Sequence, residues 1–212
     1  WGGMPSGFGQ MISTITFPQA PVSGNFSAVT SSGLTAGWTA GMNNTSGLMY
    51  IAQISTDGAF TPIMNSSSTL NMSASFGLGG QGSLLTPNAV YYLKVQASGY
   101  SWPGPFASLN STATLANSPS QTSITALTST TVNLDWLSNG NPEPGTGYEV
   151  WRDTKSGFIN PVKTSVTTSA LLINGLASKT TYYFKVRSVN LAGIFSGFDS
   201  IITTTTDPAP PG

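Results

Sequence analysis

Carboxylates are the side chains of this sequence best suited to acid–base chemistry, because its 212 residues include no histidine and no cysteine. Two paired carboxylates can hydrolyse a glycosidic bond, whereas catalytic triads, thiolate nucleophiles and conventional zinc sites need imidazole or thiolate groups. The candidates are Asp57, Asp135, Glu143, Glu149, Asp153, Asp199 and Asp207. Most catalytic chemistry is therefore closed to this chain.

The positions of these carboxylates favour structural roles. Asp135 and Glu149 are expected on the outward faces of neighbouring strands. Charge pairing across strands with Lys185 and Arg187, which we expect nearby, accounts for both carboxylates. Calcium needs several converging oxygen ligands, and the sequence contains no Asp-x-Asp motif. We predict a protein that is not an enzyme and has no catalytic residue, metal site or cofactor.

Aromatic residues in one predicted loop are the best candidates for recognition. The loop runs from Ser98 to Phe106 and contains Tyr100 and Trp102. Flat aromatic faces stack on sugar rings or on a protein partner. The same rings can instead fold onto their own domain or onto the neighbouring one. Tyr100, Trp102 and Phe106 are therefore candidate binding residues, with both interpretations open.

The elements that position these residues are predicted to be short antiparallel strands. Thr131–Trp136 and Tyr182–Arg187 alternate apolar and polar side chains, and Gly, Pro, Asn or Ser interrupts nearly every window. Alternation with period two indicates strands that bury one face. The sequence therefore predicts an all-β protein built of sandwiches.

An internal repeat divides the chain in two. Tyr91–Ala97 recurs as Tyr182–Ser188, and Leu34–Trp38 parallels Val132–Trp136. An asparagine, Asn190, follows the repeated tyrosine strand in the second copy and has no counterpart in the first. Self-similarity at this period indicates two tandem domains of one fold.

Each copy resembles a fibronectin type III domain, over roughly 22–116 and 120–206. Leu176–Tyr182 resembles the tyrosine corner of that family. The resemblance implies two tandem immunoglobulin-like β-sandwiches in a secreted or surface bacterial protein. It also implies core positions for Trp38, Tyr91, Trp136 and Tyr182. The predicted divisions are a tail over 1–21, domains over 22–117 and 118–206, and a Pro-rich linker over 207–212.

Charge is distributed unevenly between the two copies. Of the fourteen charged side chains, only Asp57 and Lys94 precede residue 119. Charged residues ordinarily keep a domain solvated and discourage pairing at sheet edges. Three interpretations remain open: the first copy packs against neighbouring subunits, it carries glycans, or its composition has drifted without a special partner.

Packing against other subunits predicts a role for the N-terminal tail, which could add a strand to an open sheet edge. The candidate assembly residues are Trp1, Phe8, Met11, Ile12, Ile15 and Phe17. The glycan interpretation rests on Asn-x-Ser/Thr triplets. These begin at Asn25, Asn43, Asn44, Asn65, Asn71 and Asn110.

Together these features predict an extracellular or cell-surface structural protein that self-associates into a filament, sheath or surface layer. The alternative is an adhesive or carbohydrate-binding spacer module of a secreted multidomain enzyme or adhesin. A net charge of zero argues against nucleic-acid binding. The sequence has no run of apolar residues long enough for a transmembrane segment.

Overall fold

The computed structural model of the chain describes residues 16–77, 80, 82–99 and 102–211, and these form fourteen β-strands. Within these residues no helix is present, and so no helix is long and apolar enough to cross a membrane. In chain order the strands are β1 (Val22–Ser27), β2 (Gly33–Thr39), β3 (Met49–Ser55), β4 (Asn65–Thr69), β5 (Ser73–Gly77), β6 (Val90–Ser98), β7 (Pro103–Ala113), β8 (Ser120–Leu127), β9 (Val132–Leu137), β10 (Gly147–Asp153), β11 (Val162–Val166), β12 (Ala170–Ile173), β13 (Thr181–Val189) and β14 (Ile202–Thr205).

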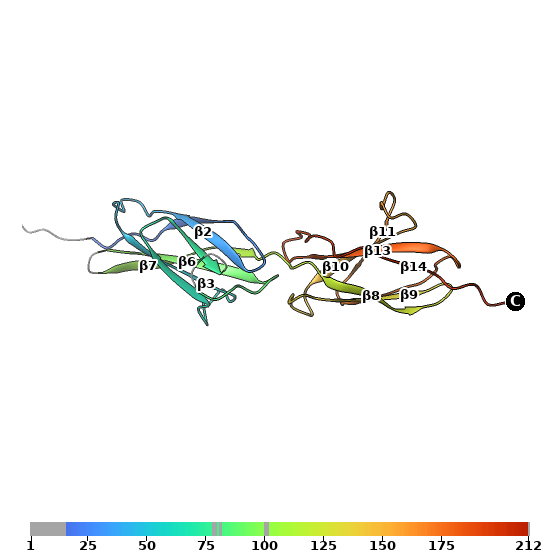
Figure 1. Cartoon of the computed structure of the whole chain (residues 1–212). Helices are drawn as coiled ribbons and strands as arrows, with labels where there is room; N and C mark the ends of the chain where they lie inside the picture. Colours follow the sequence, from blue (N-terminus) through green and yellow to red (C-terminus); the bar gives the residue numbers. More distant parts are fainter. Residues whose placement is uncertain (1–15, 78–79, 81, 100–101, 212) are drawn as a thin grey trace, which may run out of the picture.

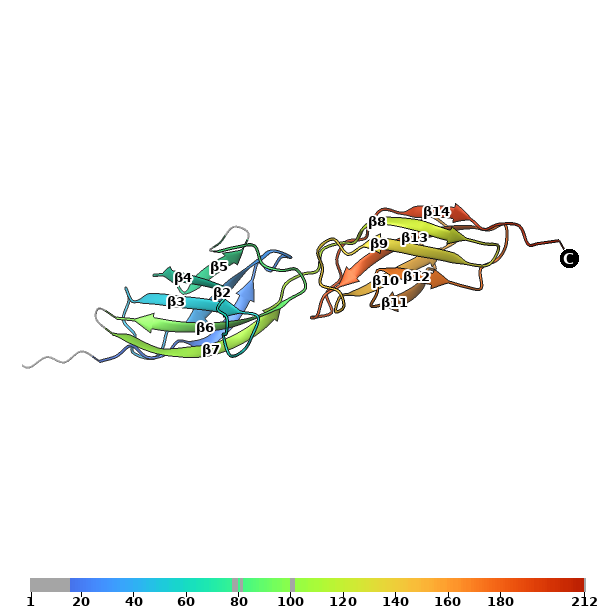
Figure 2. The same ribbon diagram turned by 90° about the horizontal axis from the view of Figure 1, so that it is seen from below.

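Strands β1–β7 form the first sandwich, called domain 1 below. One sheet has the order β1-β2-β5 and the other β4-β3-β6-β7, and every pairing is antiparallel. Strands β8–β14 form domain 2, with sheets β8-β9-β12 and β11-β10-β13-β14. The two domains therefore share one topology, and Figures 1 and 2 show them placed end to end.

The two cores are built from matching residues because the repeated sequences fold to matching positions. Trp38 packs on Tyr50 with ring centroids 5.7 Å apart, and Trp136 packs on Tyr148 at 5.4 Å. Each tryptophan lies in the three-stranded sheet and each tyrosine in the four-stranded sheet. The pairs therefore join the two layers of each sandwich, where aromatic burial contributes several kcal/mol at about 25 cal/mol per Å².

A tyrosine hydroxyl closes the same turn in both domains. The backbone N–H of Thr86 donates to the Tyr91 hydroxyl at 2.9 Å, and that of Ala177 donates to the Tyr182 hydroxyl at 3.1 Å. Tyr91 is 1 % exposed, whereas Tyr182 is half-buried and packs against the edge of its core. Both hydroxyls therefore contact backbone five residues upstream of their own tyrosine.

The prediction that Asp135 and Glu149 lie on neighbouring strands is wrong. Asp135 belongs to β9 in the three-stranded sheet of domain 2, whereas Glu149 belongs to β10 in the four-stranded sheet. In this sandwich fold, consecutive strands β9 and β10 cross from one sheet to the other. Asp135 instead accepts hydrogen bonds from Thr125 and Asn133 on its own sheet.

Candidate functional site

Buried polar side chains join the two domains at a contact called the junction below. Asn88, in the turn before β6, donates through Nδ2 to the Thr146 hydroxyl of domain 2 at 2.9 Å. Its Oδ1 accepts the backbone N–H of Leu191 at 2.7 Å. Asn88 is 3 % exposed and Thr146 is fully buried. One domain 1 amide thus bridges two separate loops of domain 2.

Asn190 makes the reciprocal contact from domain 2. Its Nδ2 donates to the backbone carbonyl of Thr114 at 3.0 Å, and its Oδ1 accepts the N–H of Ile194 at 2.8 Å. Thr114 ends domain 1 and donates its hydroxyl to the carbonyl of Thr86 at 2.7 Å. Asn190 therefore fixes its own loop and the end of the preceding domain together.

A second pair of amides clamps the chain that runs between the domains. The N–H of Asn117 donates to Asn141 Oδ1 at 2.8 Å, and Asn141 Nδ2 returns a bond to the carbonyl of Asn117 at 2.8 Å. The Ser188 hydroxyl donates to the same carbonyl at 2.6 Å. The connecting segment is therefore hydrogen-bonded through both the backbone N–H and the backbone carbonyl of Asn117.

Because the junction consists of neutral hydrogen bonds, it fixes the domains without ion pairs. A buried hydrogen bond contributes about 0.5–1.5 kcal/mol net, while a buried group left without its partner costs about 1–3 kcal/mol. The Asn88 bonds to domain 2 and the Asn190 bond to Thr114 form only when the domains meet in this orientation. Neutral contacts of this kind are also little affected by salt.

The opposite end of domain 1, called its free end below, repeats the amide clamp. Asn44 Oδ1 accepts the N–H of Gln19 at 2.9 Å, and Asn44 Nδ2 donates to the carbonyl of Gln19 at 2.9 Å. Asn44 and Gln19 therefore correspond to Asn141 and Asn117. The free end and the loops of domain 2 at the junction are the same end of the same fold.

Exposed aromatic side chains lie at this free end. Phe17 and Trp102 are each 65 % exposed, and their ring centroids are 6.3 Å apart in an edge-on arrangement. Phe106, 41 % exposed, lies instead under Lys94, whose Nζ is 4.8 Å from the ring centroid. Of the candidate residues, the structure thus brings together one from the predicted assembly tail and one from the predicted binding loop. Tyr100 and the other candidate assembly residues, Trp1, Phe8, Met11, Ile12 and Ile15, lie outside the described residues.

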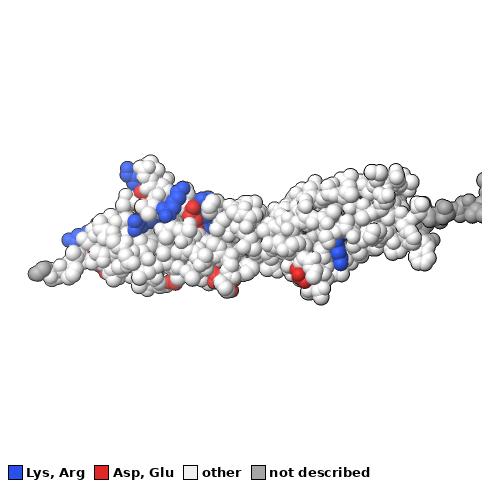
Figure 3. Space-filling view, turned by 180° about the vertical axis from the view of Figure 1, so that it is seen from behind, with Lys and Arg blue, Asp and Glu red and all other residues white. Residues whose placement is uncertain are grey.

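Domain 2 gathers three of its six cations, Lys163, Lys185 and Arg187, around the indole ring of Trp151, and we call this surface the basic face. Lys163, Trp151 and Lys185 lie side by side on β11, β10 and β13. The two Nζ atoms are 4.3 and 4.5 Å from the Trp151 centroid. At these distances both ammonium groups make cation–π contacts with the indole ring. Figure 3 shows basic side chains over this part of domain 2 and an almost uncharged surface on domain 1.

Lys185 is enclosed by further aromatic rings. Its Nζ lies 4.2 Å from the ring centroids of Phe158 and of Phe198. Partial burial, together with the positive charge of Arg187, lowers the pKa of Lys185 below its usual value. Arg187 itself lies 3.8 Å from the Phe195 centroid. Aromatic faces thus hold two cations beside each other on one strand.

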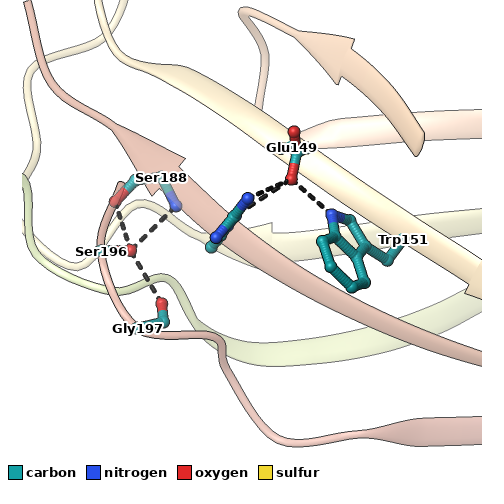
Figure 4. Close-up of polar contacts among 6 residues, drawn as sticks. Glu149, Trp151, Ser188, Ser196 and Gly197 are labelled. Carbon is teal, nitrogen blue, oxygen red and sulfur yellow. Dashed lines mark hydrogen bonds and ion pairs between the residues drawn. The ribbon is translucent and has the colours of Figure 1, made fainter. Parts of the chain in front are cut away.

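Glu149 supplies a negative charge on the basic face and forms an ion pair with Arg187. It accepts bonds from Arg187 at 2.7 and 3.0 Å and from the Trp151 indole nitrogen (Figure 4). Although partial burial opposes it, these hydrogen bonds hold the pKa of Glu149 below its usual value. Ser196 bonds to Ser188 of β13 and so fixes the segment that carries Phe195 and Phe198.

Two other ionisable groups of domain 2 have structural partners. Asp199 accepts bonds from the N–H and hydroxyl of Thr122 at 2.9 and 2.7 Å, and these outweigh its burial and lower its pKa. Burial, and then a hydrogen bond to Glu143, raises the pKa of Tyr148. Among the described residues no three acidic side chains gather as metal ligands would.

The six candidate glycosylation asparagines differ in how accessible their amide nitrogens are. Asn25, Asn43, Asn71 and Asn110 are exposed, while Asn44 and Asn65 are half-buried. The Nδ2 atoms of Asn44, Asn65 and Asn110 donate to backbone carbonyls. Asn25, Asn43 and Asn71 therefore offer the most open attachment points, and glycosylation stays a prediction.

Sequence reasoning missed the junction as a functional element. Its partners lie far apart in the chain, and Asn88 and Leu191 are 103 residues apart. One signal was available, because Asn190 is the asparagine that the first copy lacks. Its role as the contact to the preceding domain explains that difference.

Comparison with known families assigns domain 2. Residues 117–204 match the model of the fibronectin type III domain. The structure also resembles a two-domain fibronectin type III segment of chicken tenascin, with a TM-score of 0.50 and 14 % identity, over 87 % of this chain and 97 % of that one. At this identity the likeness shows the fold alone.

Two curated relatives are bacterial chitinases. Chitinase Chi52 of Paenibacillus xylanexedens is 29 % identical over 99 residues, which cover 44 % of this chain and 18 % of that protein. Chitinase D of Niallia circulans is 31 % identical over 91 residues, covering 41 % of this chain and 16 % of that protein. The matched segments thus span less than a fifth of the length of either chitinase.

Proposed function

Because residues 117–204 form a fibronectin type III domain behind a second sandwich of the same fold, we propose that the chain is a rigid, non-catalytic spacer. In this role it belongs to a longer secreted protein of the chitinase type and holds other modules at a set separation. The chitinase matches support this choice and the predicted extracellular location. The observation that carries the proposal is the junction.

The junction supports a spacer because it opposes bending between the domains. Rotation of one domain against the other would separate Asn88 from Thr146 and Asn190 from the Thr114 carbonyl. Either separation would expose a buried polar group to solvent or leave it buried without a hydrogen-bond partner. A linker without such bonds would leave relative domain motion as the default.

Small-angle X-ray scattering of the full chain tests this proposal. We expect the unaltered chain to scatter as one elongated particle, and Asn88→Ala to broaden the range of interdomain arrangements. Asn174→Ala, at an exposed asparagine beyond β12, is the matched control and should leave the profile unchanged. A flexible unaltered chain, or no effect of Asn88→Ala, would contradict a rigid spacer.

Carbohydrate binding is a second candidate function, favoured by the exposure of Trp102. An uncharged surface with an open indole ring suits stacking on a neutral sugar. Retention on insoluble chitin, measured for the unaltered chain and for Trp102→Ala, tests it. Tyr92→Ala, at a partly exposed ring of β6 outside that loop, is the control. Equal retention of all three proteins would remove this candidate.

A filament subunit receives less support than a spacer. The matched relatives are chitinases, and the scarcity of charge in domain 1 is equally compatible with contacts inside one long chain. Analytical ultracentrifugation separates the two roles, because a filament subunit would associate as its concentration rises.

A further inference from the structure

The free end of domain 1 contains a cavity of about 190 Å³, which we call the socket. Its lining consists of Gly47, Leu48, Met49, Leu70, Ser98 and Gly99. Leu70 is 67 % exposed and Met49 is 46 % exposed. An uncharged, partly apolar hollow of this kind marks a contact surface when its occupant can be identified.

The internal repeat identifies what the socket corresponds to. Tyr50 matches Tyr148 across the two cores, so Gly47 and Leu48 match Gly145 and Thr146. Both glycines have positive φ, at 87° and 134°. At the junction, Gly145 and Thr146 receive the Asn88 side chain of the preceding domain. The socket is therefore the place where a preceding domain would insert the residue equivalent to Asn88.

The chemistry of the socket differs from that of the junction. Leu48 stands where the Thr146 hydroxyl accepts the Asn88 amide. Gly99 stands where Asn190 donates to the preceding domain, because the repeat aligns Tyr91 with Tyr182. An asparagine inserted beside Leu48 would lose the hydroxyl partner that Thr146 gives Asn88. With Gly99 in place of Asn190, the carbonyl equivalent to that of Thr114 would also lose its amide donor. A buried polar group without a partner is costly, whereas an apolar side chain fits.

The far end of domain 2 shows which side chain this chain would itself insert. Lys179 has a φ of 50° and Asn88 a φ of 49°. The Lys179 N–H donates to the carbonyl of Asp207 at 3.3 Å, as the Asn88 N–H donates to that of Leu115 at 3.1 Å. Lys179 is thus the equivalent of Asn88, and its ammonium would be desolvated in an apolar socket.

We propose that the socket receives an apolar side chain from the end of another β-sandwich module that precedes domain 1, and that it rejects the chain's own Lys179 end. The inference rests on the proposed spacer function, which places further modules in the same protein. It also says which preceding module each domain accepts. Domain 2 accepts a module whose contacting turn carries a polar side chain, and domain 1 accepts one whose contacting turn carries an apolar side chain. This preference also disfavours head-to-tail self-assembly through this surface.

A tandem of two full chains tests the socket in its natural register. Residues 1–206 of the first copy are followed directly by residues 17–212 of the second. Phe17 and Pro18 then separate Thr206 from Gln19, just as Leu115 and Ala116 separate Thr114 from Asn117. Because the sequence contains no cysteine, single spin labels can be introduced freely. Thr154→Cys in the first copy and Ser66→Cys in the second, both exposed, report on the new contact.

The readout is the width of the label-to-label distance distribution. The same two labels placed in one single chain measure the natural junction and give the reference width. With Lys179 unaltered, we expect a distance distribution broader than the reference. With Lys179→Met in the first copy, we expect the reference width. Lys155→Met, at another exposed lysine of domain 2, should stay broad. Equal widths for the Lys179 and Met variants would overturn the proposal.

Exchange of specificity provides a second measurement. Leu48→Thr in the second copy should broaden the Lys179→Met tandem, and it should narrow a Lys179→Asn tandem. Far-ultraviolet circular dichroism of each tandem verifies that the sandwiches are folded. If the single chain dimerises and Leu48→Thr abolishes that dimerisation, a second copy occupies the socket. This result would overturn the proposal. The label-to-label distribution in the single chain tests the spacer function separately, because its two labels are separated by the natural junction alone.

Discussion

The two domains place the same amide clamp at the same end of the fold, yet they use that end differently. In domain 2, Asn141 and Asn190 are each 4 % exposed; Asn141 clamps the connecting segment, and Asn190 bonds to the preceding domain. In domain 1, Asn44 clamps Gln19 beside Leu48 and Gly99. The clamp therefore orders the entering chain, whereas the residues around it decide what kind of neighbour can dock.

Charge follows the same division. Domain 2 holds four of its six cations on aromatic faces and pairs Glu149 with Arg187, whereas domain 1 has only Asp57 and Lys94. A shared framework with different surfaces leads to one expectation. Changes to the core should affect both domains alike, and changes at the ends or to charges should affect them unequally.

Truncation of the core tryptophans should have the largest effect and should be equal in the two domains. Trp38 is 6 % exposed and Trp136 is 4 % exposed. Trp38→Ala and Trp136→Ala should each lower the free energy of unfolding of their own domain by about 3–5 kcal/mol. Urea unfolding followed by domain-specific amide resonances measures both. A difference of several kcal/mol between them would show that the cores are not equivalent.

Removal of the clamps should have the next largest effect and should be unequal. Asn141 makes three hydrogen bonds in a buried site, so Asn141→Ala should cost domain 2 about 2–3 kcal/mol. Asn44 makes two bonds and is half-buried, so Asn44→Ala should cost domain 1 about 1 kcal/mol. Equal losses would mean that the junction adds nothing to the clamp.

The strand pattern predicted the cores because aromatic and alternating residues bury one face wherever they occur. The tyrosine corner at Leu176–Tyr182 joins residues close in sequence, and the Tyr182 hydroxyl accepts the backbone N–H of Ala177 there. The sheet that each strand joins did not follow from alternation. Asp135 and Glu149 were therefore placed together although β9 and β10 lie in different sheets.

The junction and the socket depend on contacts between loops, which carry no periodic signal. Asn88 is an ordinary turn asparagine until Thr146 and Leu191 are brought to it. Leu48 likewise gives no sign of lining a cavity until the repeat is mapped onto the structure. Comparison of the two copies at equivalent positions was needed to give both residues a meaning.

Acid should destabilise domain 2 more than domain 1. The pKa values of Asp199 and Glu149 are lowered in the folded state, from about 3.9 and 4.3 when unfolded. Their ionised forms therefore stabilise the fold above about pH 4, and this stabilisation is lost as the pH falls through the lowered folded values. The single carboxylate of domain 1, Asp57, is exposed.

Thermal unfolding of each domain between pH 7 and pH 2 measures this difference. Asp199→Asn should lower the stability of domain 2 at pH 7 and make its dependence on pH shallower. The new asparagine still offers Thr122 a hydrogen-bond acceptor, but this acceptor carries no charge. Parallel pH curves for the two domains would show that these carboxylates do not account for the difference.

Loss of one cation from the basic face should have the smallest effect. Lys163 is exposed and lies 4.3 Å from the Trp151 ring centroid, so Lys163→Gln should cost domain 2 about 0.5–1 kcal/mol. Lys179→Gln removes an equally exposed charge at the far end and should change nothing, and domain 1 should be unaffected by either. If both substitutions cost the same, net charge rather than the indole contact stabilises domain 2, and the aromatic stack is only a consequence of where its lysines lie.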